Sequence, residues 1–272
     1  MLFCDKISFR VMSGKKTIII GNWKMFNNIH QSSTLLARLH QNIDSHRDVE
    51  VVIAPGFLAL QPLSLEIDGR RIKLAAQNAY FKDEGAFTGE VSFSQLRNLV
   101  DYVIIGHSER RIYFEESLDL IRDKVAACVR NGITPILCVG ETAEERKYKE
   151  TKTVLHDQVT TALANLTAEE VAEIVIAYEP VWAITTFGGE IAKPSVVKEE
   201  LQFIRKQVGD LYGGSTAKKI RIIYGGSVDD NTIGGYLDIE GCDGAIPGSA
   251  SLNYHKFSKI VQLANKKTIK RK

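Results

Sequence analysis

The sequence predicts a single α/β domain in which eight parallel strands, each followed by a helix, close into a (β/α)8 barrel. The chain has 272 residues, a usual length for an α/β barrel that forms one domain. Eight short segments rich in β-branched residues recur along it, and the stretches between them have helical periodicity. An open, doubly wound sheet would alternate in the same way, but eight units in roughly 250 residues favour a closed barrel.

The eight predicted strands are short apolar runs that end at turn-forming or polar residues. They cover residues 17–21, 49–54, 72–77, 102–106, 133–139, 174–178, 220–224 and, as the weakest of the eight, 242–247. Most of them are apolar at almost every position, which is typical of parallel strands that are buried on both faces. We therefore expect helices to cover the outside of the sheet.

Helical periodicity is clearest in two of the intervening segments. In the first, Ser32 and Ser33 are expected to cap a helix whose apolar positions are Leu35, Leu36, Leu39 and Ile43. In the second, a typical helix end at Asn131 and Gly132 follows the apolar positions Leu118, Ile121, Val125 and Val129.

The charge and hydropathy patterns argue against several classes of function. The 35 lysines and arginines nearly balance the 33 aspartates and glutamates, so no net field favours nucleic acid or an anionic membrane as a partner. No apolar run approaches the ~20 residues that span a bilayer, and the N-terminus lacks a signal-peptide pattern. The four cysteines have no metal-type spacing, so no metal is expected. A cytoplasmic protein is the resulting expectation.

The two ends of the chain are expected to lie outside the barrel. Residues 1–16 lack periodicity and form a predicted N-terminal extension, in which Met12 is an alternative start to Met1. Residues 265–272 form a basic C-terminal tail that we expect to be frayed and solvated. The barrel, and with it the catalytic domain, is therefore predicted over residues 17–264.

Polar residues gather directly after the predicted strands, where a (β/α)8 barrel builds its active site. Asn22 and Lys24 follow the first strand, His107 follows the fourth and Glu179 follows the sixth. Glycine-rich turns follow the seventh and eighth strands, and they contain Ser227, Gly248 and Ser249. Barrels commonly bind phosphate after these two strands, and glycine lets backbone N–H groups approach an oxyanion closely, so the paired turns predict a phosphate site.

The residue types at the other strand ends suit proton transfer beside a carbonyl group. Glu179 follows an apolar strand and precedes Pro180, so its carboxylate is expected to be partly desolvated and more basic. His107 stands at a predicted helix N-terminus, which favours a neutral imidazole able to donate a hydrogen bond to the carbonyl oxygen. Lys24 taken alone would be interpreted as a surface lysine, but beside Asn22 and the other strand ends it is predicted to bind an anionic substrate.

Five motifs together resemble the triosephosphate isomerase family. They are GNWKM at 21–25, IGHSERR at 105–111, CVGET at 138–142, AYEPVWAI at 177–184 and YGGSV at 224–228, and they occur in the family's order. The resemblance spans residues 18–261. It implies a TIM barrel that interconverts dihydroxyacetone phosphate and D-glyceraldehyde 3-phosphate in glycolysis and gluconeogenesis, without a cofactor.

The resemblance also implies roles for individual residues. Glu179 would move the proton between C1 and C2, His107 would polarise and protonate at oxygen, and Asn22 and Lys24 would hold the substrate. Glu109 matches a position that contacts the lysine. The segment 77–90 resembles the family's interdigitating dimer loop, which implies a homodimer in which Thr88 reaches the neighbouring subunit's Asn22 region.

Two segments depart from the family pattern, and both lie on the phosphate side. In the lid that follows Glu179, Thr185 replaces the glycine whose N–H meets the phosphate, and Gly188 with Gly189 is an alternative source of this contact. After the eighth strand, Pro247 and Ser249 replace a valine and a glycine. These changes predict weaker substrate binding rather than impaired proton transfer. Because a closed lid excludes water, the altered tip is also expected to affect turnover or fidelity.

Two other functions remain alternatives to an active triose-phosphate isomerase. One is a non-catalytic sugar-phosphate-binding or scaffold protein, and the other is a barrel isomerase of another small phosphate ester. The complete set of Asn22, Lys24, His107 and Glu179 argues against a scaffold, whereas the altered lid is the best support for one.

Overall fold

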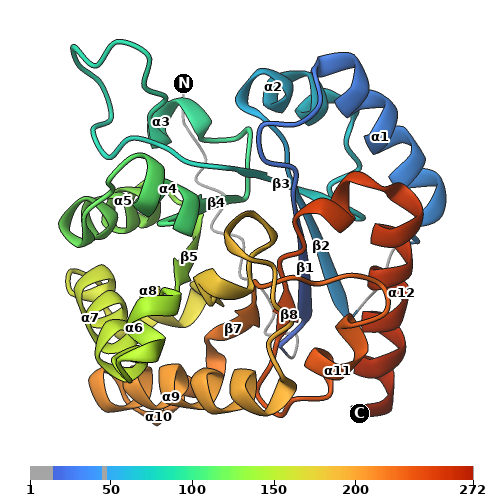
Figure 1. The fold of residues 1–272 in the computed structure, drawn as a ribbon. Helices are drawn as coiled ribbons and strands as arrows, with labels where there is room; N and C mark the ends of the chain where they lie inside the picture. Colours follow the sequence, from blue (N-terminus) through green and yellow to red (C-terminus); the bar gives the residue numbers. More distant parts are fainter. Residues whose placement is uncertain (1–14, 45–47, 272) are drawn as a thin grey trace.

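The computed structural model describes residues 15–44 and 48–271. Within these residues eight parallel strands form a closed barrel in sequence order, and helices surround it (Figure 1). The strands are β1 (Thr17–Asn22), β2 (Val49–Ala54), β3 (Lys73–Ala76), β4 (Tyr102–Ile105), β5 (Thr134–Val139), β6 (Val175–Tyr178), β7 (Arg221–Tyr224) and β8 (Gly244–Ala245). The predicted (β/α)8 barrel is therefore confirmed.

Helices follow every strand. They are α1 (Ile29–Asn42), α2 (Phe57–Glu66), α3 (Phe93–Leu96), α4 (Ser108–Tyr113), α5 (Leu118–Arg130), α6 (Ala143–Lys147), α7 (Thr151–Leu163), α8 (Ala168–Glu173), α9 (Pro194–Tyr212), α10 (Gly214–Lys219), α11 (Ile233–Leu237) and α12 (Tyr254–Arg271). Short 3-10 helices lie at Val181–Ala183 (η1), Thr185–Phe187 (η2) and Ser249–Leu252 (η3). None of the helices in the described ranges has the length and apolar character needed to cross a membrane.

The apolar strands produce two cores, because alternate side chains of a strand point to opposite faces. In β1, Ile18 and Ile20 belong to the cluster inside the barrel, whereas Ile19 belongs to the larger cluster between the barrel and its helices. This division explains why most of the strands are apolar throughout rather than alternating with polar residues.

The start of α1 differs from the prediction. The helix begins at Ile29, and Asn28 caps it: the Asn28 side chain accepts from the Gln31 backbone N–H, and the Gln31 side chain accepts from that of Asn28. The predicted cap at Ser32 and Ser33 is wrong, because both residues lie inside the first turns of the helix. The sequence signal was the Asn-x-x-Gln pattern of a capping box. The end predicted for α5 is confirmed, with Asn131 as its C-cap.

Strand β8 is much shorter than the predicted 242–247. It pairs with β7 only through Tyr224 and Ala245, and with β1 through two residues. Proline lacks a backbone N–H, so Pro247 has no donor for the ladder. Its carbonyl still accepts from the Asn22 N–H at 3.0 Å, which joins the turn after β8 to the end of β1.

A partly buried ionic network lies at the N-terminal end of the barrel. Glu50, the second residue of β2, accepts hydrogen bonds from Lys73 at 2.6 Å, Tyr102 at 2.5 Å and Arg221 at 3.0 Å. Those three are the first residues of β3, β4 and β7. Although burial opposes the charge, Arg221 and Lys73 lower the pKa of Glu50 to about 2. The carboxylate is therefore held ionised in the folded protein.

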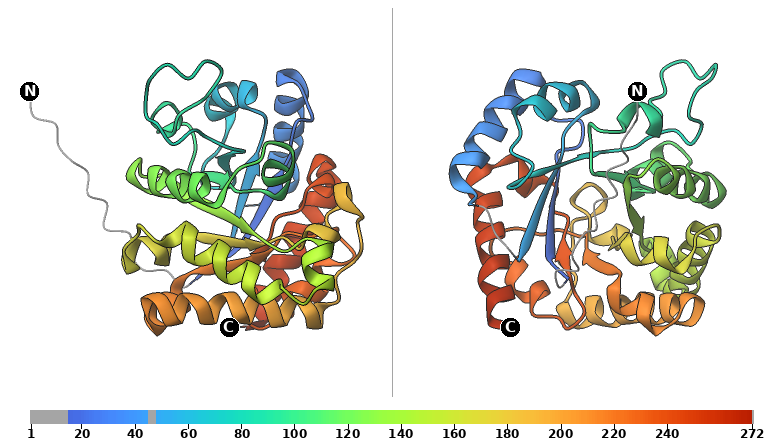
Figure 2. Two further views of the ribbon diagram at one scale, coloured as in Figure 1. Left: turned by 60° about the vertical axis from the view of Figure 1, so that its left-hand side comes forward. Right: turned by 180° about the vertical axis from the view of Figure 1, so that it is seen from behind.

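The loop between β3 and α3 lies outside the compact ring of helices and strands, whereas the C-terminal helix is part of it. The loop between β3 and α3, teal in Figure 1, projects away from the barrel in each view of Figure 2. At the other end of the chain, α12 runs along the barrel and continues to Arg271, so much of the segment predicted as a frayed tail is helical. The prediction concerning Met1 and Met12 lies outside the described residues.

Candidate active site

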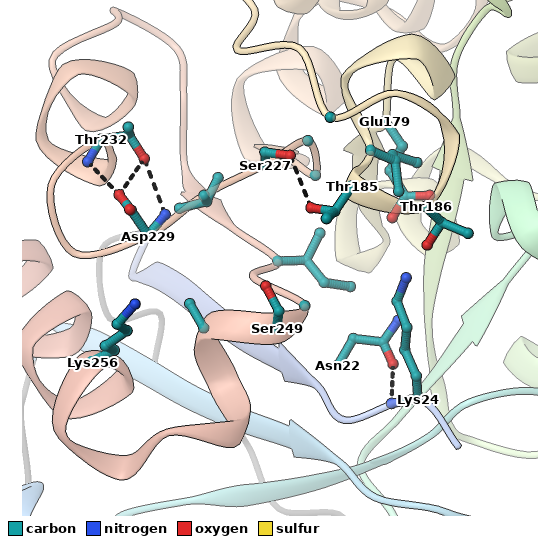
Figure 3. A pocket seen from close by; sticks show the side chains of 18 of the residues that line it. Asn22, Lys24, Glu179, Thr185, Thr186, Ser227, Asp229, Thr232, Ser249 and Lys256 are labelled. Carbon is teal, nitrogen blue, oxygen red and sulfur yellow. Dashed lines mark hydrogen bonds between the residues drawn. The ribbon is translucent and has the colours of Figure 1, made fainter. Parts of the chain in front are cut away.

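A pocket of about 570 Å³ opens at the C-terminal ends of the strands. The predicted site residues that line it are Asn22, Lys24, His107, Glu179, Thr185, Ser227, Gly248 and Ser249. Figure 3 shows Glu179, Thr185 and Thr186 on one side of this space, and Asn22, Lys24 and Ser249 across from them. Residues from the ends of β1, β4, β6, β7 and β8 thus come together as the barrel rule predicts.

Glu179 lies directly after β6, and its side chain is almost fully buried. Its backbone N–H donates to the Val139 carbonyl at 2.7 Å, which fixes its position beside β5. Its Oε1 lies 3.6 Å from His107 Nε2, and its Oε2 is buried without a partner in the described structure. A buried carboxylate oxygen with no internal partner is unusual in a folded protein.

Two glycines make room for Glu179. A Cβ added at Gly140 would lie 2.0 Å from the Glu179 carbonyl oxygen, and one added at Gly225 would lie 2.4 Å from Glu179 Cγ. Both distances are far below van der Waals contact. The glycines at the ends of β5 and β7 therefore permit the carboxylate to approach His107.

His107 is the N-cap of α4, and this geometry fixes its tautomer. Its Nδ1 accepts a hydrogen bond from the Glu109 backbone N–H at 3.2 Å, so Nδ1 is unprotonated and the imidazole hydrogen is on Nε2. The Nε2 atom is the one that faces Glu179. The neutral imidazole predicted from the sequence is therefore the form that these contacts favour.

Lys24 occupies the left-handed region, with φ of 51°, which is uncommon for a residue with a side chain. Its N–H donates to Asn22 Oδ1 at 3.1 Å, and its carbonyl accepts from Gln77 Nε2 at 2.7 Å. Its ammonium group pairs with Glu109. Gln77 was not predicted to support the site, because a glutamine 53 positions away in the chain carries no local signal of this contact.

Glu109 lies outside the pocket lining and acts on it through Lys24. Burial would raise the pKa of the Glu109 carboxyl, but the hydrogen bond from Lys24 and the charge of its ammonium group keep the pKa below the ordinary value. The carboxylate is therefore a permanent partner for the lysine. Thr88 also lies outside the pocket, in the exposed part of the projecting loop.

The hinge of the lid is anchored to a buried glutamate. Glu141 accepts from the Trp182 indole N–H at 2.8 Å and from the Tyr178 hydroxyl at 3.1 Å. Its carbonyl also accepts from the Val181 N–H at 2.9 Å. These bonds fix the segment immediately after Glu179.

The lid tip places its residues differently from the prediction. Thr185 lines the pocket, and its hydroxyl lies 3.2 Å from that of Ser227, which donates to the Ala183 carbonyl. Gly188 does not line the pocket, whereas Gly189 does. The Gly189 N–H donates to the Ile184 carbonyl at 3.0 Å, so it is engaged within the lid. The shifted phosphate contact predicted for Gly188 therefore has no support from this geometry.

Other members of the predicted turns, motifs and lid also line the pocket: Ile184, Thr186, Gly189, Ile191, Gly225, Gly226, Val228 and Ala250. The sequence did not single out the remaining lining residues, which are Phe26, Asp229, Thr232, Ile246, Asn253 and Lys256. Most of them follow a strand end by several residues, and the sequence does not tell which loop residues turn inward. In Figure 3, Asp229, Thr232 and Lys256 lie on the far side of Ser227 and Ser249 from Glu179.

The arrangement combines a base, a neutral hydrogen-bond donor and a fixed cation in one pocket. Such a set suits proton abstraction next to a carbonyl, with the donor and the cation stabilising the charge that develops on oxygen. In the part of the chain that the structure describes, no three His, Cys, Asp or Glu side chains are grouped so that they could hold a metal ion.

Comparison with known proteins gives a consistent result. The family model described as triosephosphate isomerase matches residues 17–264. The curated triosephosphate isomerase of Clostridium acetobutylicum is 46% identical over 245 residues, which is 90% of this chain and 98% of the relative. That of Carboxydothermus hydrogenoformans is 44% identical over 249 residues, or 91% and 98% of the two chains. That of Clostridium tetani is 44% identical over 248 residues, or 91% and 96%.

Proposed function

Because this chain belongs to the triosephosphate isomerase family, we propose that its pocket interconverts dihydroxyacetone phosphate and D-glyceraldehyde 3-phosphate, with Glu179 as the base. The observation that carries this assignment is the pair formed by Glu179 Oε1 and His107 Nε2, 3.6 Å apart at the base of the pocket. With this placement the base can act on one carbon of a substrate while the hydrogen-bond donor acts on the oxygen of the adjacent carbon.

In this proposal Glu179 removes a proton from the carbon next to the carbonyl. The electrons of the broken C–H bond form the C=C bond of an enediolate, and negative charge develops on the former carbonyl oxygen. His107 gives its Nε2 proton to that oxygen and takes up the proton of the hydroxyl on the deprotonated carbon, so that the two oxygens exchange roles, while the Lys24 ammonium stabilises the charge. The protonated Glu179 then returns the proton to the neighbouring carbon, so no cofactor or net redox change is required.

The phosphate group is assigned to the turns after β7 and β8. Ser227, Gly248 and Ser249 line this side of the pocket, and Thr185 closes over it from the lid. We keep the expectation that substrate binding is weaker here than in a site with glycine at positions 185 and 249. Proton transfer is expected to be unaffected, because these changes leave Glu179 and His107 themselves unaltered.

We also propose that two copies of the chain form a homodimer through the face that carries the projecting loop. Large apolar side chains are exposed there or near it: Met25 is 99% exposed, Leu58 84% and Phe87 40%. Thr88 is exposed in the same loop and remote from its own pocket. Sedimentation velocity tests this directly. If the protein sediments as a monomer at micromolar concentration, both the proposed dimer and the proposed role of Thr88 are refuted.

The same proposal places the catalytic domain at residues 17–264, with short extensions at both ends, in a cytoplasmic enzyme of glycolysis and gluconeogenesis. A chain shortened to 17–264 should retain the turnover of the full chain. A large loss of turnover in a folded truncated protein would assign the extensions a role.

The decisive experiment is a coupled isomerase assay of the full chain in both directions, together with Glu179→Gln and His107→Gln. Loss of the base or the donor should lower kcat by about 10²–10⁴-fold. Glu173→Gln, on an exposed residue at the end of α8, is the matched control and should leave kcat unchanged.

Two results would overturn the assignment. No turnover by the wild-type protein, with ligand binding unaltered in Glu179→Gln, would indicate a sugar-phosphate-binding protein. A preference for another aldose or ketose phosphate would indicate that the lid selects a different ester.

A further inference from the structure

The tip of the lid contacts helix α4 through two neighbouring residues. The Thr186 hydroxyl donates to Glu109 Oε1 at 3.0 Å. The Phe187 ring lies against the Tyr113 ring, with centroids 5.6 Å apart and planes tilted by 37°. Glu109 and Tyr113 both belong to α4, so one polar and one aromatic contact join the same two elements.

The polar contact leads directly to the substrate-binding lysine. Glu109 Oε1 accepts from Thr186 and also pairs with Lys24 Nζ, while Glu109 Oε2 lies 3.7 Å from His107 Nδ1. The Lys24 backbone is held by Asn22 and Gln77, but its long side chain is fixed at its end by this carboxylate. A change in the orientation of Glu109 would therefore move the ammonium group.

The local backbone explains why the tip reaches α4. The 3-10 turn of η2 is closed by the Phe187 N–H, which donates to the Ile184 carbonyl at 2.8 Å. Gly188 and Gly189 then have positive φ values of 146° and 68°, so the chain reverses direction immediately after the phenylalanine. This reversal leaves the Phe187 ring on the side of the lid that faces Tyr113.

We propose that Thr186 and Phe187 latch the lid tip onto α4, and that Thr186 is a positioning residue which orients Lys24 through Glu109. The proposal rests on the substrate-binding role assigned to Lys24 above. It makes lid closure and lysine alignment one event, because the hydroxyl contact with Glu109 exists only while the tip lies on α4. The aromatic pair supplies binding energy for the closed position and does not touch the lysine.

The two contacts can be tested separately. Thr186→Val removes the hydroxyl at nearly constant volume and should lower kcat/KM by about threefold to tenfold, the range expected for one hydrogen bond to a charged acceptor at a partly exposed site. Thr186→Ser keeps the hydroxyl and should stay within about twofold of wild type. Thr160→Val is the control, since within the described residues the Thr160 hydroxyl bonds to backbone carbonyls of its own helix. Equal kinetics for Thr186→Val and wild type would refute the positioning role.

A double-mutant cycle tests the aromatic latch. Phe187→Ala and Tyr113→Ala should each lower kcat and raise the fraction of enediolate that loses phosphate to give methylglyoxal, and the double variant should be no worse than either single variant. Multiplicative losses would show that the rings act independently and would overturn the latch.

Hydrogen–deuterium exchange of the lid peptide 181–193 provides a readout that does not depend on activity. Thr186→Val and Phe187→Ala should each increase exchange of this peptide in the full chain, whereas Thr160→Val should not. Unchanged exchange in both lid variants would refute the latch even if the isomerase assignment is correct. Conversely, an inactive wild-type protein with faster exchange in both variants would refute the proposed function and support the latch.

Discussion

Replacing Gly225 by alanine should displace the catalytic carboxylate without unfolding the barrel. The added Cβ would lie 2.4 Å from Glu179 Cγ and 3.1 Å from Oε1, whereas carbon atoms in contact are about 3.5–4.0 Å apart. The backbone at this point has little freedom to retreat, because the Gly225 N–H donates to the Tyr178 carbonyl at 2.8 Å and Ile246 Cγ2 lies 3.0 Å from the new atom. The Glu179 side chain must therefore move by about 1 Å or more.

The size of the effect follows from this displacement. A misplacement of about 1 Å in a reacting group costs on the order of 10²-fold in rate, or about 2.7 kcal/mol in the activation free energy. We expect kcat of Gly225→Ala to fall by about 100-fold. KM should change less than kcat, because Lys24, Gly248 and Ser249 do not contact the added atom. Overpacking should lower the free energy of unfolding by about 1–3 kcal/mol, which a barrel of this size tolerates.

The measurement is steady-state kinetics in both directions, with circular dichroism and thermal unfolding to confirm the fold. Gly234→Ala in α11 is the control, because a Cβ at that position meets no atom within 4 Å. If folded Gly225→Ala keeps kcat within threefold of wild type, the observed position of Glu179 is not the one from which it acts, and the assignment of the base from this geometry fails.

Three further outcomes are expected. Glu50→Gln should lower the free energy of unfolding at pH 7 by about 3 kcal/mol, because the pKa of Glu50 is about 2 in the folded protein against an ordinary value of 4.5. This stabilisation is complete above about pH 4.5 and is lost as the pH falls towards 2, so urea unfolding should give a smaller difference between variant and wild type at pH 3 than at pH 7. A constant difference would contradict the linkage. Trp182→Phe removes a donor to the buried Glu141 and should cost about 1–2 kcal/mol of stability, seen as a melting temperature lower by several degrees; an unchanged melting temperature would show that this bond contributes nothing. Ser249→Gly should lower KM with little change in kcat, and a KM equal to or above wild type would show that serine is no obstacle at the phosphate turn.

The sequence was most informative where burial dominates. The strands are apolar on both faces, so the number and order of the eight barrel strands could be predicted, and the topology then brought Asn22, Lys24, His107 and Glu179 to one end. The start of α1 was misplaced because serine and asparagine are both good N-caps, and the reciprocal bonds of Asn28 and Gln31 decided between them. Local capping preference was too weak to make that choice.

Contacts between distant side chains were the least predictable part. Gln77 reaches the Lys24 carbonyl, and Thr186 reaches Glu109, across separations of 53 and 77 residues. No local pattern marks either residue, since each contact depends on how two loops fold over the same strand ends. The shortening of β8 was not predicted, because Pro247 indicates a missing ladder bond but not how far the pairing retreats.

Because β8 is so short, the boundary between β7 and β8 is weakly paired. Ala245 pairs in register with β7, and the Asp243 and Ile246 N–H groups beside it donate to the Ile222 and Tyr224 carbonyls, so less ladder has to break here than between β1 and β2, where six residue pairs are in register. Spontaneous opening of the barrel should therefore begin between β7 and β8, and amide protons along this boundary should exchange first. The phosphate-binding turns follow these same two strands. A ligand that contacts both turns would keep β7 and β8 together. Substrate binding should therefore slow the exchange of amide protons well beyond the atoms that it touches, and it should raise the cooperativity of unfolding.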